Sequence, residues 1–198
     1  MKLFFSLLII VLLGVVAYLA YQYRADFGLG GKGSGGSGAN STPSWQTVDR
    51  SSDDFKVEMP AAATETQIPA YTDHGVVEQV PMIESATDPG TTYAVAWANN
   101  PPVEQAAGED AEKTLDMARD GALGRTQTSL IGESRNDRDG YRVRTFLARN
   151  AGGGILNGRL ILTGTHLYML IATFPSVSAR HQEDVDRFFD SFSLTGQQ

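Results

Sequence analysis

The sequence predicts an α+β protein, in which an N-terminal transmembrane helix is followed by an antiparallel sheet flanked by helices. Three features support this class. An uncharged apolar run opens the chain, short runs of alternating apolar and polar residues follow from residue 44 onward, and two later segments change to helical spacing. Alternation is typical of half-buried strands, and a spacing of three or four residues is typical of amphipathic helices. The order strands, helix, strands, helix predicts mostly antiparallel neighbours.

The opening run extends from Leu3 to Tyr21 and contains 19 residues without a charge. As a helix it would be roughly 28 Å long, which matches the hydrocarbon thickness of a bilayer. A cleaved signal peptide is the alternative, with Val15-Val16-Ala17 as its cleavage site. The run is longer than the usual apolar core of such a peptide, and this favours an uncleaved anchor.

We therefore expect a single-pass membrane protein anchored by residues 1–24, with residues 3–21 in the membrane. The short leading tail favours a cytoplasmic N-terminus and a periplasmic or extracellular C-terminal domain. Either interpretation of the apolar run exports residues 25–198.

Residues 25–43 predict a flexible linker, because seven of the eleven residues from Gly28 to Gly38 are glycine. Gly28, Gly30 and Gly33 also spell the GxGxxG motif of dinucleotide-binding proteins. That motif needs a strand before it and a helix after it, and this segment has neither. The folded domain is expected over residues 44–198.

Alternation predicts the first strands of this domain in "SWQTVDR", "DFKVEMP" and "GVVEQVPMIESA". Pro81 lies in the third and cannot donate to a ladder, so an edge or a bulge is expected there. In "TTYAVAWAN" the large residues Tyr93, Val95 and Trp97 share one face, and alanines occupy the other. A face of small residues predicts close approach by a helix.

The first predicted helix is "GEDAEKTLDMARDGALG", with its apolar stripe at Ala111, Leu115, Ala118 and Ala122 and its end at Gly121 or Gly124. Four strands follow: "RTQTSLIGES", "YRVRTFLAR", "ILNGRLILT" and "HLYMLIATF". The last is apolar on both faces, which predicts a central strand covered on both sides. The closing helix, "SARHQEDVDRFFDSFSL", is expected to start at a cap on Ser176 or Ser178, and its apolar stripe is Val185, Phe188, Phe189 and Phe192.

Four segments follow one order along the chain: "FKVEMP", "LDMARDG", "GRLILTGTHLYMLIATFP" and "DVDRFFDSFSL". This order resembles that of the PsbP-like fold, including small bacterial envelope domains of the DcrB type, over roughly residues 44 to 194. The resemblance implies a sandwich with a central antiparallel sheet and helices on its faces. It also implies an accessory or binding module, and it carries over no catalytic residues. DcrB-type proteins tend to be lipoproteins, and this chain has no cysteine.

No catalytic, cofactor-binding or metal site is predicted. His74, His166 and His181 are scattered, and none has the close ligand spacing of a metal motif. Asp137, Asp139 and Gly140 imitate part of a calcium loop, but "RNDRDG" joins two alternating strands and predicts a hairpin turn. The helix acids predict a solvated face; they are Glu109, Asp110, Glu112, Asp116 and Asp120.

Charge is distributed unevenly. Residues 44–120 carry 4 basic and 15 acidic side chains, and residues 121–198 carry 9 and 7. The balance of these two segments, −11 and +2, gives −9 and excludes nucleic acid as a natural partner. Arg142, Arg144 and Arg159 form a candidate partner-contact set, although the arginines of one half can equally offset the acids of the other.

These observations favour a non-enzymatic, membrane-anchored envelope module that binds another envelope protein. A small-molecule or lipid carrier with a pocket between sheet and helix is the alternative, and an enzyme is the third.

Overall fold

The computed structural model describes residues 44–71, 77–87, 90–99, 109–138 and 140–196. These residues form ten strands, two α-helices and two short 3₁₀ helices. The strands are β1 (Gln46–Arg50), β2 (Phe55–Met59), β3 (Thr64–Tyr71), β4 (Val77–Ala86), β5 (Thr92–Asn99), β6 (Thr128–Arg138), β7 (Tyr141–Asn150), β8 (Ile155–Leu162), β9 (His166–Phe174) and β10 (Ser193–Leu194). The helices are η1 (Ser51–Asp53), α2 (Glu109–Thr126), η3 (Val177–Ala179) and α3 (Gln182–Ser191).

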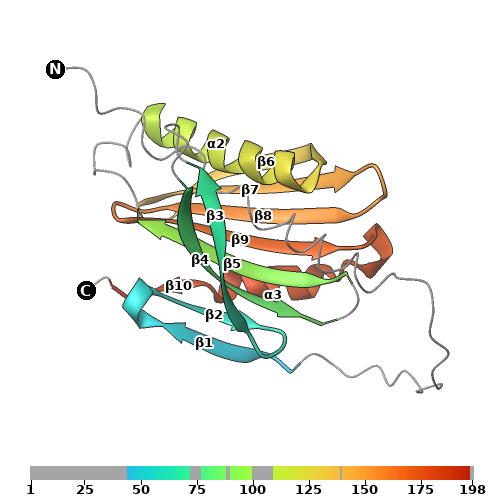
Figure 1. Ribbon diagram of the computed structural model, residues 1–198, viewed down its shortest axis with the longest axis horizontal. Coiled ribbons are helices and arrows are strands. Elements are labelled where there is room, and N and C mark those ends of the chain that lie inside the picture. The colour runs from blue at the N-terminus through green and yellow to red at the C-terminus, as the bar shows by residue number, and fades with distance from the viewer. Residues whose placement is uncertain (1–43, 72–76, 88–89, 100–108, 139, 197–198) are drawn as a thin grey trace.

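The strands form two sheets in which all described pairs are antiparallel (Figure 1). The larger sheet has seven strands in the order β3-β4-β5-β9-β8-β7-β6, and the smaller has the order β1-β2-β10. The predicted central strand, β9, is the fourth of the seven. β9 has a strand on each side, and both of its faces are covered by other elements of the domain. This explains why its sequence is apolar on both faces.

The predicted α+β class is wrong, because strands dominate the described residues and only two α-helices accompany them. Two strands, β3 and β10, lie where alternation identifies none. β3 is an edge strand of the large sheet and its first half is polar, and β10 is two residues long. No helix within the described residues is long and apolar enough to cross a membrane. The predicted anchor, residues 1–24, and the linker, residues 25–43, lie outside those residues.

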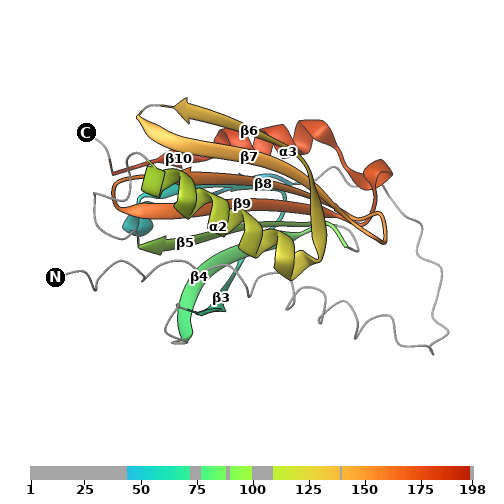
Figure 2. The same cartoon turned by 90° about the horizontal axis from the view of Figure 1, so that it is seen from above.

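Helix α2 lies over one face of the large sheet, where it contacts β6, β7 and β8 (Figure 2), and the alanines of β5 belong to this face. Ala94 and Ala96 share one buried cluster with the apolar stripe of the helix, which comprises Ala111, Leu115, Ala118 and Ala122. Larger side chains, such as Leu115, Phe146 and Leu160, fill the rest of the same cluster, so the interface is closely packed and excludes water.

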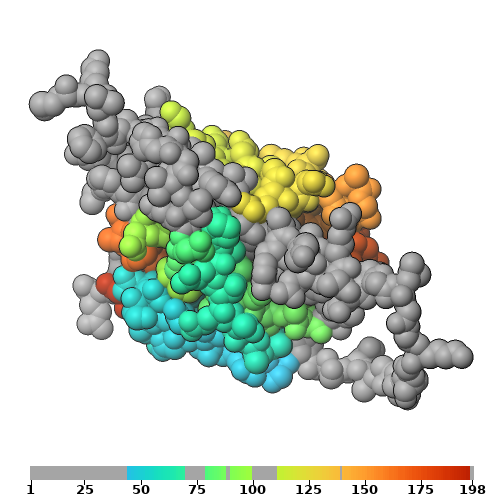
Figure 3. Space-filling view, in the orientation of Figure 1, coloured from blue at the N-terminus to red at the C-terminus, as the bar shows by residue number. Residues whose placement is uncertain are grey.

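Helix α3 and the small sheet cover the opposite face, where a second cluster joins β2, β5, β9 and α3. Leu170 is fully buried there with Val185, Phe188 and Phe189, and Phe192 packs against the edge of the cluster. Figure 3 shows the β1–β2 hairpin (cyan) and α2 (yellow) on opposite sides of the domain. The domain thus has three layers, with the large sheet in the middle.

The C-terminus of α2 and the N-terminus of α3 both differ from the prediction. α2 continues through Gly121 and Gly124 to Thr126, whose hydroxyl bonds the carbonyl of Ala122 at 2.8 Å, and Gln127 then turns the chain with φ +50°. Ser176 accepts a bond from the Ala179 backbone and so caps η3, not α3. α3 begins at Gln182, and its N-cap residue, His181, makes no side-chain capping bond.

Two local predictions concern the turn between β6 and β7 and the position of Pro81 in β4. β6 and β7 pair from Thr128↔Asn150 to Arg138↔Tyr141, and Gly140 has φ +84°, a conformation that glycine adopts without strain. The hairpin turn is therefore confirmed. Pro81 pairs with Gln67 of β3, and the β4–β5 ladder begins one residue later at Met82. β4 lies between β3 and β5 and is not an edge strand, so the edge prediction is wrong for the strand as a whole. Pro81 itself has a ladder partner on one side only, and its missing donor therefore costs no hydrogen bond to β5.

Candidate functional site

A hollow lies between α3 and the α3-facing side of β6, β7 and β8. Two adjoining clefts of about 310 and 480 Å³ occur there, and both are lined by Thr145 and Arg159. We call the two clefts together the α3 groove. It exists because the β6–β7 hairpin extends the sheet beyond the helix, so that this end of the sheet face has no element packed on it within the described residues.

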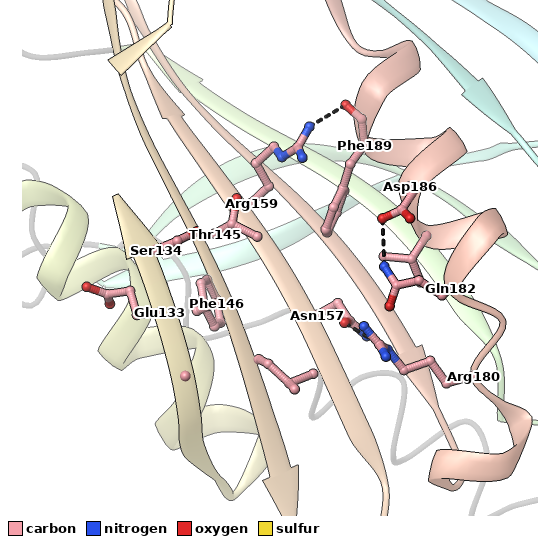
Figure 4. Close-up of a pocket in the computed structure, with 13 residues that line it drawn as sticks. Glu133, Ser134, Thr145, Phe146, Asn157, Arg159, Arg180, Gln182, Asp186 and Phe189 are labelled. Carbon is pink, nitrogen blue, oxygen red and sulfur yellow. Dashed lines mark hydrogen bonds between the residues drawn. The ribbon is translucent and has the colours of Figure 1, made fainter. Parts of the chain in front are cut away.

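Arg159 lies in the middle of the α3 groove, directly across the ladder from Thr145. Its guanidinium donates from Nη1 to the Phe189 carbonyl oxygen at 2.9 Å (Figure 4). The same nitrogen also donates to Asp190 Oδ1 at 3.0 Å. The same guanidinium lies 4.7 Å from the centre of the Phe189 ring. These contacts hold Arg159 against the helix, while its Nε is buried without an acceptor.

A second arginine, Arg180, lies near the other end of the groove, just before α3. Its Nε donates to Asn157 Oδ1 at 3.0 Å, and Figure 4 shows the two side chains lying against each other. Asn157 is only 4% exposed, and its Nδ2 is a buried donor without an acceptor. Asn157 and Arg159 are two residues apart on β8, so their side chains leave the same face of the sheet.

The remaining lining combines apolar and polar side chains. The half-buried or buried apolar residues are Tyr141, Val143, Leu147, Ile161, Phe192 and Leu194. Exposed Leu130 and Ile131 lie just before Gly132, which lines the smaller cleft. The groove therefore offers apolar contact along its floor and hydrogen-bond donors on β8 and at the start of α3.

The structure does not bring the three predicted arginines together. Arg142 and Arg144 project from β7 toward α2, whereas Arg159 projects toward α3, because neighbouring residues across a ladder share a face and Arg159 is opposite Thr145. Arg144 is completely buried and pairs with Asp116 and, at 2.6 Å, with Glu112. Arg142 is 3.1 Å from Asp137. Of the three, only Arg159 lines the α3 groove.

The predicted solvated face of α2 needs a correction. Glu112 and Asp116 turn toward the sheet, where Arg144 and Arg135 pair with both. The spacing of the acids along the helix is compatible with either arrangement. The choice depends on the partner strand, which presents arginines to this face.

Glu133 on β6 belongs to the same ion-pair cluster and is largely buried. Burial alone raises the pKa of its carboxyl, but hydrogen bonds from Arg119 and Arg135 outweigh burial and leave the pKa below its usual value. The cluster therefore keeps a nearly buried carboxylate charged, and it links α2 to the edge of the sheet.

A separate set of polar contacts joins η1 to the start of β9 and to Trp97 of β5. Tyr168 donates to the Asp53 carbonyl oxygen at 3.0 Å, and Trp97 Nε1 donates to Asp53 Oδ1 at 3.0 Å. Burial and the nearby carboxylates of Asp54 and Asp53 raise the pKa of Tyr168 above its usual value. His166 Nδ1 is 4.0 Å from Asp54 Oδ2. These bonds attach the small sheet to the large one.

The histidines and the acidic residue Asp139, which are candidate metal ligands by residue type, are not brought together within the described residues. His181 is exposed at the start of α3, far along the chain from His166, and His74 and Asp139 lie outside the described residues. Within the residues that the structure describes, no cluster of three or more metal-ligating side chains occurs.

Asn157 and Arg180 are the groove residues that the sequence did not indicate. An asparagine inside an apolar strand was the available signal, since a buried amide requires partners. Its partner, Arg180, comes 23 residues later, and no local pattern connects the two.

A scan of protein-family models and a sequence search of curated proteins found no match. The fold is similar to the solution structure of cyanobacterial PsbP from Synechocystis sp. PCC 6803, with a TM-score of 0.54 and 14% identity over 82% of this chain and 98% of that chain. A crystal structure of a Pseudomonas aeruginosa protein of unknown function aligns with a TM-score of 0.40 and 11% identity, over 78% and 98% of the two chains. Kinship with the DcrB type stays a prediction. The seven-stranded sheet with a helix on each face, together with the first of these matches, shows that this chain has a PsbP-like fold.

Proposed function

We propose that the domain is a non-catalytic binding module and that its partner, a segment of another envelope protein, lies in the α3 groove. The observation that carries the proposal is the sheet face of the β6–β7 hairpin, which extends past α3 and presents the half-buried residues Tyr141, Val143 and Leu147. Soluble domains seldom leave connected apolar surface uncovered without a binding role.

The residue types that line the groove support a polypeptide partner. Tyr141, Arg138 and Arg159 line the larger cleft. Tyrosine and arginine are enriched at protein interfaces.

The apolar run at residues 3–21 supports an exported location for this module, because both interpretations of the run place the rest of the chain outside the cytoplasm. A C-terminal alkaline phosphatase fusion tests it, since that enzyme becomes active only after export. An inactive phosphatase fusion alongside a fluorescent cytoplasmic reporter fusion would contradict the location.

Site-specific photocrosslinking in cells tests the binding surface. A photoreactive amino acid at Val143, on the groove floor, should give one discrete crosslinked product, and the same amino acid at Lys113, on the outside of α2, should not. The product should disappear when Leu147→Asp is added to the Val143 variant, because a charge on the floor opposes apolar contact. Equal crosslinking from both positions would contradict the proposal.

A carrier of a small amphiphile is the second candidate. The larger cleft, about 480 Å³, falls in the size range of small-molecule sites and has apolar and polar lining. Native mass spectrometry distinguishes the two candidates: a carrier should retain a bound mass that Val143→Asp removes, whereas a protein-binding module should show the unmodified mass.

A further inference from the structure

The donors of the smaller cleft of the α3 groove outnumber their acceptors. Asn157 Nδ2 and Arg159 Nε are buried and have no acceptor within the described residues. A buried donor without a partner is costly because it has lost its hydrogen bonds to water, so native structures seldom keep two of them two residues apart. Both donors come from β8, on the face toward α3, and both residues line the cleft.

Arg180 adds a positive charge at the same place. Within the described residues its hydrogen bond to Asn157 Oδ1 is made by Nε, and no carboxylate pairs with its guanidinium. Arg159 and Arg187, by contrast, pair with Asp190 and Glu58. Asn157 therefore orients the guanidinium of Arg180 and leaves its two terminal nitrogens available.

We propose that Arg180, Asn157 and Arg159 form an oxyanion subsite, which takes a carboxylate or a phosphate group of the molecule that occupies the α3 groove. This inference rests on the proposed binding function and adds the chemistry of its ligand. A guanidinium held through Nε presents two parallel donors, the geometry that binds a carboxylate or phosphate in bidentate fashion. A small shift of Asn157 and Arg159 toward the ligand would also supply acceptors for their buried donors.

The volume and surroundings fit such a group. A cleft of about 310 Å³ accommodates the charged end of a ligand, and the larger cleft continues past Thr145 along the apolar floor. The carboxylate of the wall residue Asp186 accepts a hydrogen bond from Gln182 at 2.6 Å, and that of Asp190 pairs with Arg159, so each is engaged by a neighbouring side chain.

The test is an NMR titration of the full-length protein in an uncharged detergent, with inorganic phosphate and with acetate added at constant ionic strength. The Arg180 Nε–H and Asn157 side-chain amide resonances should shift and saturate, with a dissociation constant of about 1–10 mM, as expected of an isolated group. Arg180→Gln should weaken binding at least about tenfold, while Arg187→Gln, on the exposed side of α3, should not change it. Tighter binding of phosphate than of acetate would assign the ligand group as phosphoryl, and the reverse order as carboxyl.

Absence of saturable shifts in the wild-type protein would overturn the subsite, as would equal loss in the Arg187→Gln variant. A near-ultraviolet circular dichroism spectrum confirms that each variant is folded, and Arg180→Lys, which keeps the charge, should retain part of the affinity. The crosslinking at Val143 reports on the groove separately. Crosslinking without anion binding would leave the binding module standing and remove the subsite.

Discussion

The ring of Phe146 lies against Gly158, its partner across the β7–β8 ladder. A Cβ atom on Gly158 would be 2.2 Å from Phe146 Cζ, closer than non-bonded carbon atoms approach. Glycine inside a buried strand normally weakens it, and here its missing side chain is the space that the aromatic ring fills. The pair lies on the α2 side, directly behind the floor of the α3 groove.

Gly158→Ala should therefore destabilise the protein. The added methyl group must displace a buried ring in a well-packed layer, which typically costs about 1–3 kcal/mol. The urea unfolding midpoint measures this loss. Gly132→Ala is the control, because a Cβ atom there would meet nothing within 4 Å and the backbone has ordinary dihedral angles. Equal midpoints for the two variants would show that Phe146 moves aside freely.

Leu170→Ala should be among the more destabilising changes in the chain. Leu170 is fully buried at the centre of β9 between β5 and β8, beneath α3. Truncating such a leucine leaves a cavity and typically costs about 2–5 kcal/mol. Val177→Ala, at a residue that is 52% exposed, should cost less than about 0.5 kcal/mol. A neutral Leu170→Ala in chemical denaturation would contradict the central position of β9.

Arg144→Met should weaken the attachment of α2 to the sheet. The substitution leaves Glu112 and Asp116 without their buried partner. Breaking a fully buried pair costs about 3–5 kcal/mol, and partial hydration of these two carboxylates should reduce the loss to about 2–3 kcal/mol. Arg135→Met, at a side chain that is 57% exposed, should cost less than about 1 kcal/mol. Hydrogen exchange of the α2 amides would locate the effect, and unchanged exchange in Arg144→Met would refute it.

Glu133 should make stability depend on acid pH. Its pKa is lower in the folded protein than the usual 4.5, so the contribution is present above about pH 4.5 and is lost as the pH falls through the folded value. The difference in unfolding free energy between wild type and Glu133→Gln should be constant near neutrality and should shrink in acid. A difference that stayed constant down to the acid unfolding limit would contradict this role.

Glu84 should behave in the opposite way. Burial raises the pKa of its carboxyl, and its Oε2 is buried without a donor within the described residues. A raised folded pKa gives stability that is present below pH 4.5 and is lost as the pH rises through the folded value. Glu84→Gln should therefore gain stability over wild type between pH 4 and pH 7. Urea midpoints measured across this range would contradict the prediction if wild type gained instead.

The strands and helices with strong periodicity could be predicted because side-chain direction is a local property of the backbone. Alternation in β5 placed Ala94 and Ala96 on the face of the sheet that α2 covers, and the spacing in α3 placed Val185, Phe188 and Phe189 on its buried side. Burying an apolar face is the dominant stabilising term, so a periodic apolar pattern determines both the element and its inward side.

The edge strands could not be predicted in this way. β3 has four polar residues followed by Ile68, a proline, an alanine and a tyrosine, so no alternation extends along it, and β10 is too short to show a period. Both are strands because a neighbouring strand offers backbone hydrogen bonds, and those bonds do not depend on side-chain type. The predicted α+β class was wrong for the same reason. Alternation of apolar and polar residues identifies strands that bury one face, and it misses strands that only add backbone hydrogen bonds to a sheet.

The sequence by itself determined the layers of the domain, but tertiary structure decided which charges are buried and where the α3 groove lies. Arg142, Arg144 and Arg159 are alike in the sequence, yet Arg144 is enclosed beneath α2, Arg142 is partly exposed, and Arg159 faces α3. Arg180 meets Asn157 because the turn after β9 returns the chain over β8. Such pairings depend on strand order and on how far α3 extends across the sheet, and these are properties of long-range packing that no local period encodes.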